Sequence, residues 1–134
     1  MKKRLTNAHE VLFRQIHPKF IENGEPSSDR FRPSAQDQNM LSLDRSALIT
    51  ASEAHAQYVA TGKQSAAVFG VSVAEFAKES LTCVEDPIPV KETTPANPAH
   101  CLADYSPHAL KDQKLIAKRL KRVAIARGRL HPPE

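Results

Sequence analysis

Apolar and polar residues alternate along several short segments of this chain, which predicts β-strands. Residues 65–76 carry apolar side chains at a spacing of two, the period of a strand with one buried face. These side chains are Ala67, Phe69, Val71 and Val73. The end of this segment, residues 74–77, is equally typical of a first helical turn. Further strands are predicted at residues 11–16, 40–43, 81–84 and 99–105, where apolar runs are bounded by turn-forming residues.

A mid-chain helix is predicted from its capping residues. Thr50 followed three positions later by Glu53 forms a capping-box pattern, in which each side chain binds a free backbone N–H of the first turn. The helix is expected to run over residues 51–60 and to end near Gly62. Its apolar stripe would use Ala54 and Tyr58, together with Ala51.

A second, longer helix is predicted near the carboxyl end of the chain. Ser106 suits its N-cap, Pro107 its first turn and Gly128 the position after its last residue, which are the usual preferences at helix ends. Apolar residues recur at helical spacing between them, and we expect this stripe to pack on the body of the protein. The stripe consists of Leu110, Ile116, Ala117, Leu120, Val123 and Ala124.

Two long segments contain many turn formers. In residues 19–37, Phe20, Ile21 and Phe31 are expected to hold an otherwise polar loop on the body, and structured loops of this length are often functional. Residues 86–98 contain four prolines, which predicts an exposed, semi-rigid connector. Together the elements predict one α+β domain over residues 11–130, after a polar lead-in of residues 1–10. Its small, mainly antiparallel sheet would carry one mid-chain helix and one basic amphipathic C-terminal helix.

Composition excludes several classes of protein. The 134 residues suit a single domain, and no apolar run approaches the ~20 residues that cross a bilayer. Two cysteines, Cys83 and Cys101, are too few for a disulfide framework. Since no apolar leader follows the basic amino terminus, we expect a cytoplasmic protein with reduced thiols. A Cys83–Cys101 bridge stays open as an alternative.

The usual sequence motifs of cofactor and metal sites are missing. The six histidines show no HExxH spacing and the cysteines no CxxC spacing, so no metal site is predicted. The four glycines are widely separated, which excludes a phosphate-binding glycine-rich loop. No GxSxG motif marks a nucleophilic serine. We therefore expect neither a metal nor a cofactor.

Charge is concentrated in the predicted C-terminal helix. Eight of the nineteen basic residues fall between Lys111 and Arg129, where Asp112 is the only acid, a net +7. The remaining eleven basic and fourteen acidic residues carry a net −3. Cations on one exposed helix face can bind nucleic-acid phosphates, an acidic protein surface or anionic lipid. The simpler alternative is a solvated face with no partner. The predicted partner-binding residues are Lys111, Lys114, Lys118, Lys121 and Arg122.

A second candidate site combines Arg14, His17 and Ser42 from two predicted strands and their ends. Arginine can clamp a phosphate or carboxylate, and histidine can transfer protons near neutral pH. The order of an Arg or His, a strand with a central Ser and a later acid resembles the ADP-ribosyltransferase-like pattern. Glu75 would supply that acid, although the family's Ser-Thr-Ser and Glu-x-Glu motifs are absent. In a purely structural interpretation, Arg14 pairs with Asp37 or Asp44.

Several short motifs are spread over residues 11–130. They are the run from Leu12 to Pro18, then Gly24, Ser27-Ser28, Phe31, Pro33, Asp37, Leu41-Ser42, Ile49-Thr50-Ala51, residues 71–75 and a helix closing on Ala126-Arg127-Gly128. This set resembles small bacterial proteins that share a strand ending in RxxHP, an SSxxFxP loop and a basic C-terminal helix. No activity is established for these proteins. The resemblance implies only that the chain is a self-standing bacterial domain.

Three functions follow as hypotheses. The first is a small bacterial binding or accessory protein that engages nucleic acid or an acidic protein through its basic helix. A toxin–antitoxin, immunity or phage-defence module would be a suitable setting. The second is an ADP-ribosyltransferase-like enzyme that acts on a nucleotide or phosphorylated substrate through Arg14, His17 and Ser42. The third is an oligomeric protein in which the apolar stripe of the helix forms a dimer seam.

Overall fold

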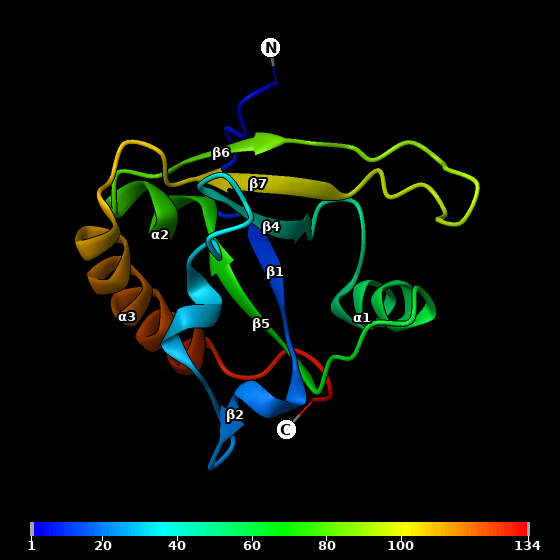
Figure 1. The fold of residues 1–134 in the computed structure, drawn as a ribbon, viewed down its shortest axis with the longest axis horizontal. Helices are drawn as coiled ribbons and strands as arrows, with labels where there is room; N and C mark the ends of the chain where they lie inside the picture. Colours follow the sequence, from blue (N-terminus) through cyan, green and yellow to red (C-terminus); the bar gives the residue numbers. More distant parts are fainter. Residues whose placement is uncertain (1, 134) are drawn as a thin grey trace.

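Five antiparallel strands form one twisted sheet in the order β5-β1-β4-β7-β6, and a short hairpin, β2-β3, lies outside it. The computed structural model describes residues 2–133. Three α-helices and two 3-10 helices complete the α+β fold that the sequence predicts (Figure 1). In chain order the elements are β1 (Val11–Ile16), η1 (Pro18–Phe20), β2 (Ile21–Glu22), β3 (Glu25–Pro26), η2 (Ser28–Phe31), β4 (Met40–Arg45), α1 (Ala51–Ala60), β5 (Ala67–Ser72), α2 (Val73–Lys78), β6 (Thr82–Glu85), β7 (His100–Asp104) and α3 (Leu110–Arg127).

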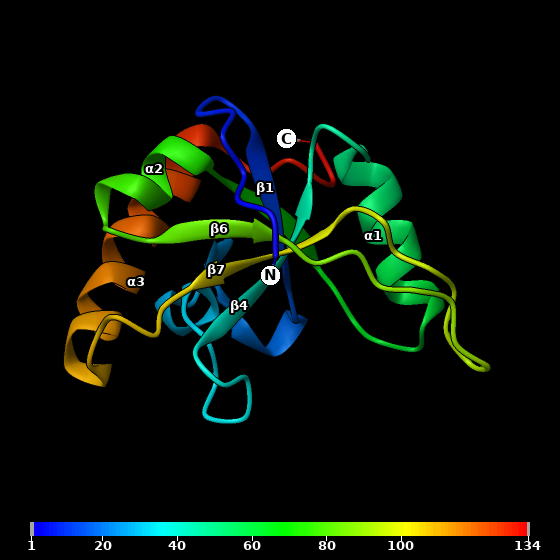
Figure 2. The same cartoon turned by 90° about the horizontal axis from the view of Figure 1, so that it is seen from above.

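The two faces of the sheet carry different helices (Figures 1 and 2). Successive side chains of a strand point to opposite faces, so Leu12 and Ile16 enter the main core with α3, whereas Phe13 packs with Ala54 of α1. The α3 residues in the main core are Ile116, Ala117, Leu120 and Ala124. Because this stripe is buried within the chain, it is not available as a dimer seam.

Two capping boxes set the starts of α1 and α2. Glu53 N donates to Thr50 Oγ1 at 3.1 Å, and Thr50 N donates back to Glu53 Oε1 at 3.0 Å, which confirms the predicted start of α1. Ser72 and Glu75 make the same pair of bonds, at 3.1 and 2.7 Å. The strand predicted over residues 65–76 is therefore too long at both ends, and its last part begins α2, which was the stated alternative.

Helix α3 begins three residues later than the sequence predicts. Its N-cap is Ala109, not Ser106. The backbone N–H of Ser106 instead donates to the Asp104 side chain at 2.8 Å, a local turn that competes with helix capping. The buried face also differs from the predicted stripe: Leu110 is 57% exposed, whereas the polar Gln113 is 4% exposed and donates to the Tyr105 carbonyl. Gly128 ends the helix as predicted.

The N-terminal residues pack against the sheet, whereas the sequence predicts a polar lead-in outside the domain. The backbone N–H of Leu5 donates to the Cys83 carbonyl at 2.9 Å, and the Leu5 side chain joins the main core. Glu10 is 5% exposed and binds Arg45 through both carboxylate oxygens. The segment before β1 therefore takes part in the packing of β4 and β6.

The loop of residues 19–37 is attached to the core as predicted. Phe31 is completely buried, and Phe20 and Ile21 pack against the same cluster. The Tyr105 hydroxyl donates to the Phe31 carbonyl. Arg14 Nε donates to the Arg30 carbonyl at 2.6 Å. These bonds hold η2 between the sheet and α3.

The connector of residues 86–98 forms a narrow arm that extends from the sheet toward α1 (Figures 1 and 2). Isolated antiparallel bridges join Ile88 to Asn97 and Lys91 to Thr94. Asn97 Nδ2 donates to Asp44 Oδ1 at 2.9 Å, which fastens the base of the arm to β4. The connector that the sequence predicts as exposed therefore also forms one wall of a cavity.

Candidate functional site

The outer face of α3 carries four cations that we call the cationic stripe: Lys111, Lys114, Lys118 and Arg122. All four side chains are exposed. Spacings of three and four residues place them on the face opposite the buried positions of the helix. Within residues 2–133 none of the four forms an ion pair.

Other cations of the same helix are neutralised by acids of the protein body. Arg119 binds Glu79 at 2.7 Å, and Arg127 binds Glu75 at 2.7 Å. Lys121, the fifth residue predicted to contact a partner, is half-buried with its ammonium group 3.8 Å from Glu25. Glu79, Glu75 and Glu25 therefore pair with cations beside the stripe and not with the stripe residues.

A groove extends the cationic stripe toward the loop of residues 19–37. Lys118, Lys121 and Arg122 line one side of it, and Ser28 and Glu25 line the other. The loop therefore adds a hydroxyl group and a carboxylate to this surface. The sequence predicted the surface from the helix residues alone.

The Arg14 guanidinium, predicted to bind a ligand or a carboxylate, instead binds two backbone carbonyls. Its Nε donates to Arg30 O and its Nη1 to Ser42 O at 3.1 Å. Burial, helped by the nearby charge of Arg30, lowers the pKa of Arg14. These contacts give Arg14 a structural role between β4 and η2, and the pairing with Asp37 or Asp44 is not formed.

The four residues of the predicted ADP-ribosyltransferase-like site do not meet in one place. Arg14 and Ser42 line the same cavity, but His17 and Glu75 are not among its lining residues. His17 Nδ1 accepts from Lys19 N at 3.1 Å and so caps η1. Glu75 caps α2 and pairs with Arg127. This geometry does not support a shared catalytic centre.

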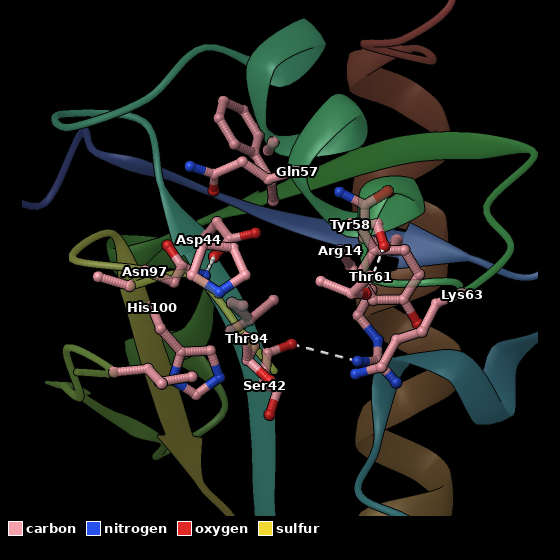
Figure 3. A pocket seen from close by; sticks show the side chains of 17 residues that line it. Arg14, Ser42, Asp44, Gln57, Tyr58, Thr61, Lys63, Thr94, Asn97 and His100 are labelled. Carbon is pink, nitrogen blue, oxygen red and sulfur yellow. Dashed lines mark hydrogen bonds between the residues drawn. The ribbon is translucent and has the colours of Figure 1, made fainter. Parts of the chain in front are cut away.

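The cavity that Arg14 and Ser42 share lies between the sheet, α1 and the arm (Figure 3). It encloses about 190 Å³. Its floor comes from β1, β4 and β7, and its walls come from α1 and residues 88–97. The labelled polar and aromatic residues in Figure 3 are Arg14, Ser42, Asp44, Gln57, Tyr58, Thr61, Lys63, Thr94, Asn97 and His100.

Two titratable groups lie opposite each other on the cavity floor. Asp44 of β4 is in register with His100 of β7. Asp44 is 9% exposed, and burial raises the pKa of its carboxyl, opposed by the Asn97 hydrogen bond and the charge of His100. His100 Nδ1 lies 3.0 Å from Asp86 Oδ2, a contact that fixes the orientation of the imidazole ring.

Sequence reasoning missed this pair. The sequence offered Asp44 only as a partner for Arg14 and His100 only as a residue that could join the Arg14 and Ser42 cluster, and it did not pair the two. Strand register brings them together from positions 56 residues apart, and no local spacing signals such a pair.

Replacing Asp44 by asparagine is expected to raise the free energy of unfolding at pH 7 by about 1 kcal/mol, the scale of one unfavourably buried polar group. A carboxyl whose pKa is raised by folding holds more protons in the folded chain, so stability falls as pH rises from the unfolded pKa, about 3.9, through the folded pKa. Asparagine removes this cost. Urea titrations should show the gain at pH 7 and its loss below about pH 4; an unchanged or lower stability at pH 7 would contradict the expectation.

Neither cysteine is suited to nucleophilic chemistry. Cys83 and Cys101 are free, buried thiols in adjacent strands. Burial raises the pKa of Cys83 to about 12 and also raises that of Cys101, so both stay protonated at neutral pH. The predicted free thiols are confirmed. Across residues 2–133, no cluster of three or more His, Cys, Asp or Glu side chains is arranged to hold a metal ion.

Comparison with known proteins gives no further assignment. The chain matches no protein-family model, no curated protein and no solved structure. In the part of the chain that the structure describes, no helix has the length and apolar character needed to span a membrane. The cationic stripe and the cavity beneath α1 are therefore the two surfaces that bear on function.

Proposed function

We propose that this protein binds nucleic acid through the cationic stripe of α3. The proposal rests on one observation: some cations of α3 form ion pairs and others do not. Arg119 and Arg127 are paired with acids of the body, whereas the four stripe residues are exposed and unpaired within residues 2–133. An uncompensated row of cations gains free energy when it displaces counterions from a phosphate backbone.

The dimensions of the stripe suit an extended polyanion. From Lys111 to Arg122 the helix rises about 16 Å at ~1.5 Å per residue. This length equals about five steps of a nucleic-acid strand at ~3.4 Å each. A row of cations this long suits the repeating phosphates of a nucleic-acid backbone better than a single carboxylate on a protein surface. We therefore favour nucleic acid over an acidic protein partner.

The contacts would be to the phosphate backbone. The stripe residues are three lysines and one arginine on a solvent-facing helix, and phosphate contacts of this kind fix position without specifying sequence. The chain has five Phe, two Tyr and no Trp, and the groove beside the stripe is lined by no aromatic side chain. Base stacking, which dominates many single-strand binders, is therefore not expected at this surface.

Binding should be strongly salt-dependent. Four phosphate contacts predict a slope of log K against log salt of about −3.6 for duplex DNA and about −2.8 for single strands. The variant Lys114→Glu/Lys118→Glu should lose about half of this slope and bind at least about tenfold more weakly at 100 mM salt. Fluorescence anisotropy with labelled duplex DNA and single-stranded RNA, titrated between 50 and 200 mM salt, measures both quantities.

A charge-matched control separates the stripe from the overall charge. Lys3→Glu/Lys91→Glu changes the net charge equally, at two exposed lysines outside α3, and should retain the wild-type slope. The proposal is rejected if neither nucleic acid binds at 50 mM salt, or if the α3 variant and the control variant behave alike.

A further inference from the structure

The cavity beneath α1 is sized for one small ring. Its volume of about 190 Å³ slightly exceeds that of an engineered protein cavity of ~150 Å³ that binds benzene. Phe13 and Tyr58 line it with aromatic surface, and Ile88 adds apolar surface from the arm. A flat ring in this cavity would meet aromatic and apolar surface beside the polar groups of the sheet.

The cavity floor presents two hydrogen-bond acceptors without partners. Asp44 Oδ1 accepts from Asn97, but Asp44 Oδ2 accepts no hydrogen bond from residues 2–133. His100 uses Nδ1 toward Asp86. In the neutral imidazole with its proton on Nδ1, which donates to this carboxylate, Nε2 is an acceptor. Both acceptors are therefore available to a hydrogen-bond donor on a ligand bound in the cavity.

A third free group lies next to these acceptors. The Ser42 hydroxyl is exposed, lines the same cavity and makes no side-chain hydrogen bond with the described residues. Ser42 is two residues before Asp44 on β4 and therefore on the same face of the sheet. Its hydroxyl can donate to a ring nitrogen or carbonyl oxygen of a ligand.

We propose that this cavity binds an amino-substituted nitrogen heterocycle, such as a cytosine or adenine base, with the exocyclic amino group donating to Asp44 and His100. An amino group supplies two N–H donors at one edge of a flat ring, and the adjacent ring nitrogen accepts from Ser42. Carboxylates accept from the cytosine amino group in other proteins as well. The oxo counterparts, uracil and hypoxanthine, place a carbonyl acceptor against the same two acceptors and are disfavoured.

Asn97 and Asp86 act as positioning residues. Asn97 Nδ2 holds the Asp44 carboxylate, and Asn97 Oδ1 accepts from the Ala99 backbone at 3.2 Å, which fixes the amide orientation. Asp86 holds the imidazole ring of His100 and is itself paired with Lys2. The arm and the N-terminal segment therefore both support the geometry of the floor.

Two matched pairs of nucleosides test the proposal by isothermal titration calorimetry on the full chain. Cytidine against uridine, and adenosine against inosine, each exchange an amino group for an oxygen. At least one amino member should bind about tenfold or more tightly than its oxo partner. Asp44→Asn should remove this preference, and circular dichroism at the same temperature should show that the variant is folded.

A variant at the opposite face provides the control. Lys114→Glu/Lys118→Glu lies on α3, across the sheet from the cavity, and should leave nucleoside binding unchanged even if nucleic-acid binding is lost. The proposal is overturned if no nucleoside binds, if neither pair shows a preference for the amino member, or if Asp44→Asn retains the preference. These outcomes are independent of the test of the cationic stripe.

Discussion

Replacing Glu10 by alanine is expected to lower the free energy of unfolding by about 3–5 kcal/mol, the cost of removing one partner from a buried ion pair. The Glu10 side chain is 2% exposed. Its two carboxylate oxygens accept from Arg45 Nε at 3.0 Å and Nη2 at 3.1 Å, and one also accepts from Ala47 N at 3.2 Å. Without Glu10, Arg45 keeps only a 3.4 Å contact to Glu85 in a largely buried position.

Urea denaturation at pH 7 measures the loss, as a lower midpoint at constant slope. The double variant Glu10→Leu/Arg45→Leu removes both charges and should recover most of the lost stability, since well-packed apolar residues often replace buried pairs at little cost. Glu79→Ala breaks the pair with the exposed Arg119 and should cost at most about 1 kcal/mol. If Glu10→Ala costs no more than Glu79→Ala, the buried ion pair is not a major source of stability.

The burial of Glu10 could not be predicted from the sequence. Residues 1–10 contain few apolar side chains, and their polarity predicts a segment outside the domain. The structure buries Glu10 because Arg45, 35 positions later, lies on a neighbouring strand. Leu5 is buried for the same reason, through its pairing with β6. Neither contact leaves a local pattern in the sequence.

Local signals predicted the fold where the physical cause was also local. The capping box of Thr50 and Glu53 marked the start of α1, because both bonds lie within one helical turn. The pattern at Ser106 failed: the backbone N–H of Ser106 donates to the Asp104 side chain in a local turn, and the helix begins only after Ala109. Local propensities therefore predicted the α+β class but misplaced the first turn of α3.

The cationic stripe and the cavity also differ in how far the sequence predicts them. The spacing of basic residues in one helix predicted the exposed face of α3, since a helix places residues three and four apart on one side. The cavity depends on Asp44 and His100, whose proximity comes from the register of β4 with β7. It also depends on Asn97 of the arm, which the sequence describes only as part of a connector. Contacts between segments distant in the sequence create this site, so no sequence motif predicts it.

Replacing Phe31 by alanine is expected to cost about 3–5 kcal/mol, as for other large aromatic side chains removed from a core. This is a large part of the ~5–15 kcal/mol that stabilises a typical domain. Phe31 is 0% exposed at the end of η2, where its carbonyl accepts from the Tyr105 hydroxyl. The cavity left behind would be closed poorly, because Arg14, bonded to the Arg30 carbonyl, holds the backbone in place.

The same substitution connects the long loop to the proposed nucleic-acid surface. Ser28 precedes Phe31 within η2 and lines the groove beside Lys118 and Arg122. Loss of the anchor should therefore increase amide hydrogen exchange in residues 19–37 before the sheet opens. Val90→Ala, at a side chain 71% exposed on the arm, is the control and should change stability by less than about 0.5 kcal/mol. Equal stability losses in the two variants, measured by urea denaturation, would show that Phe31 is not the anchor of the loop.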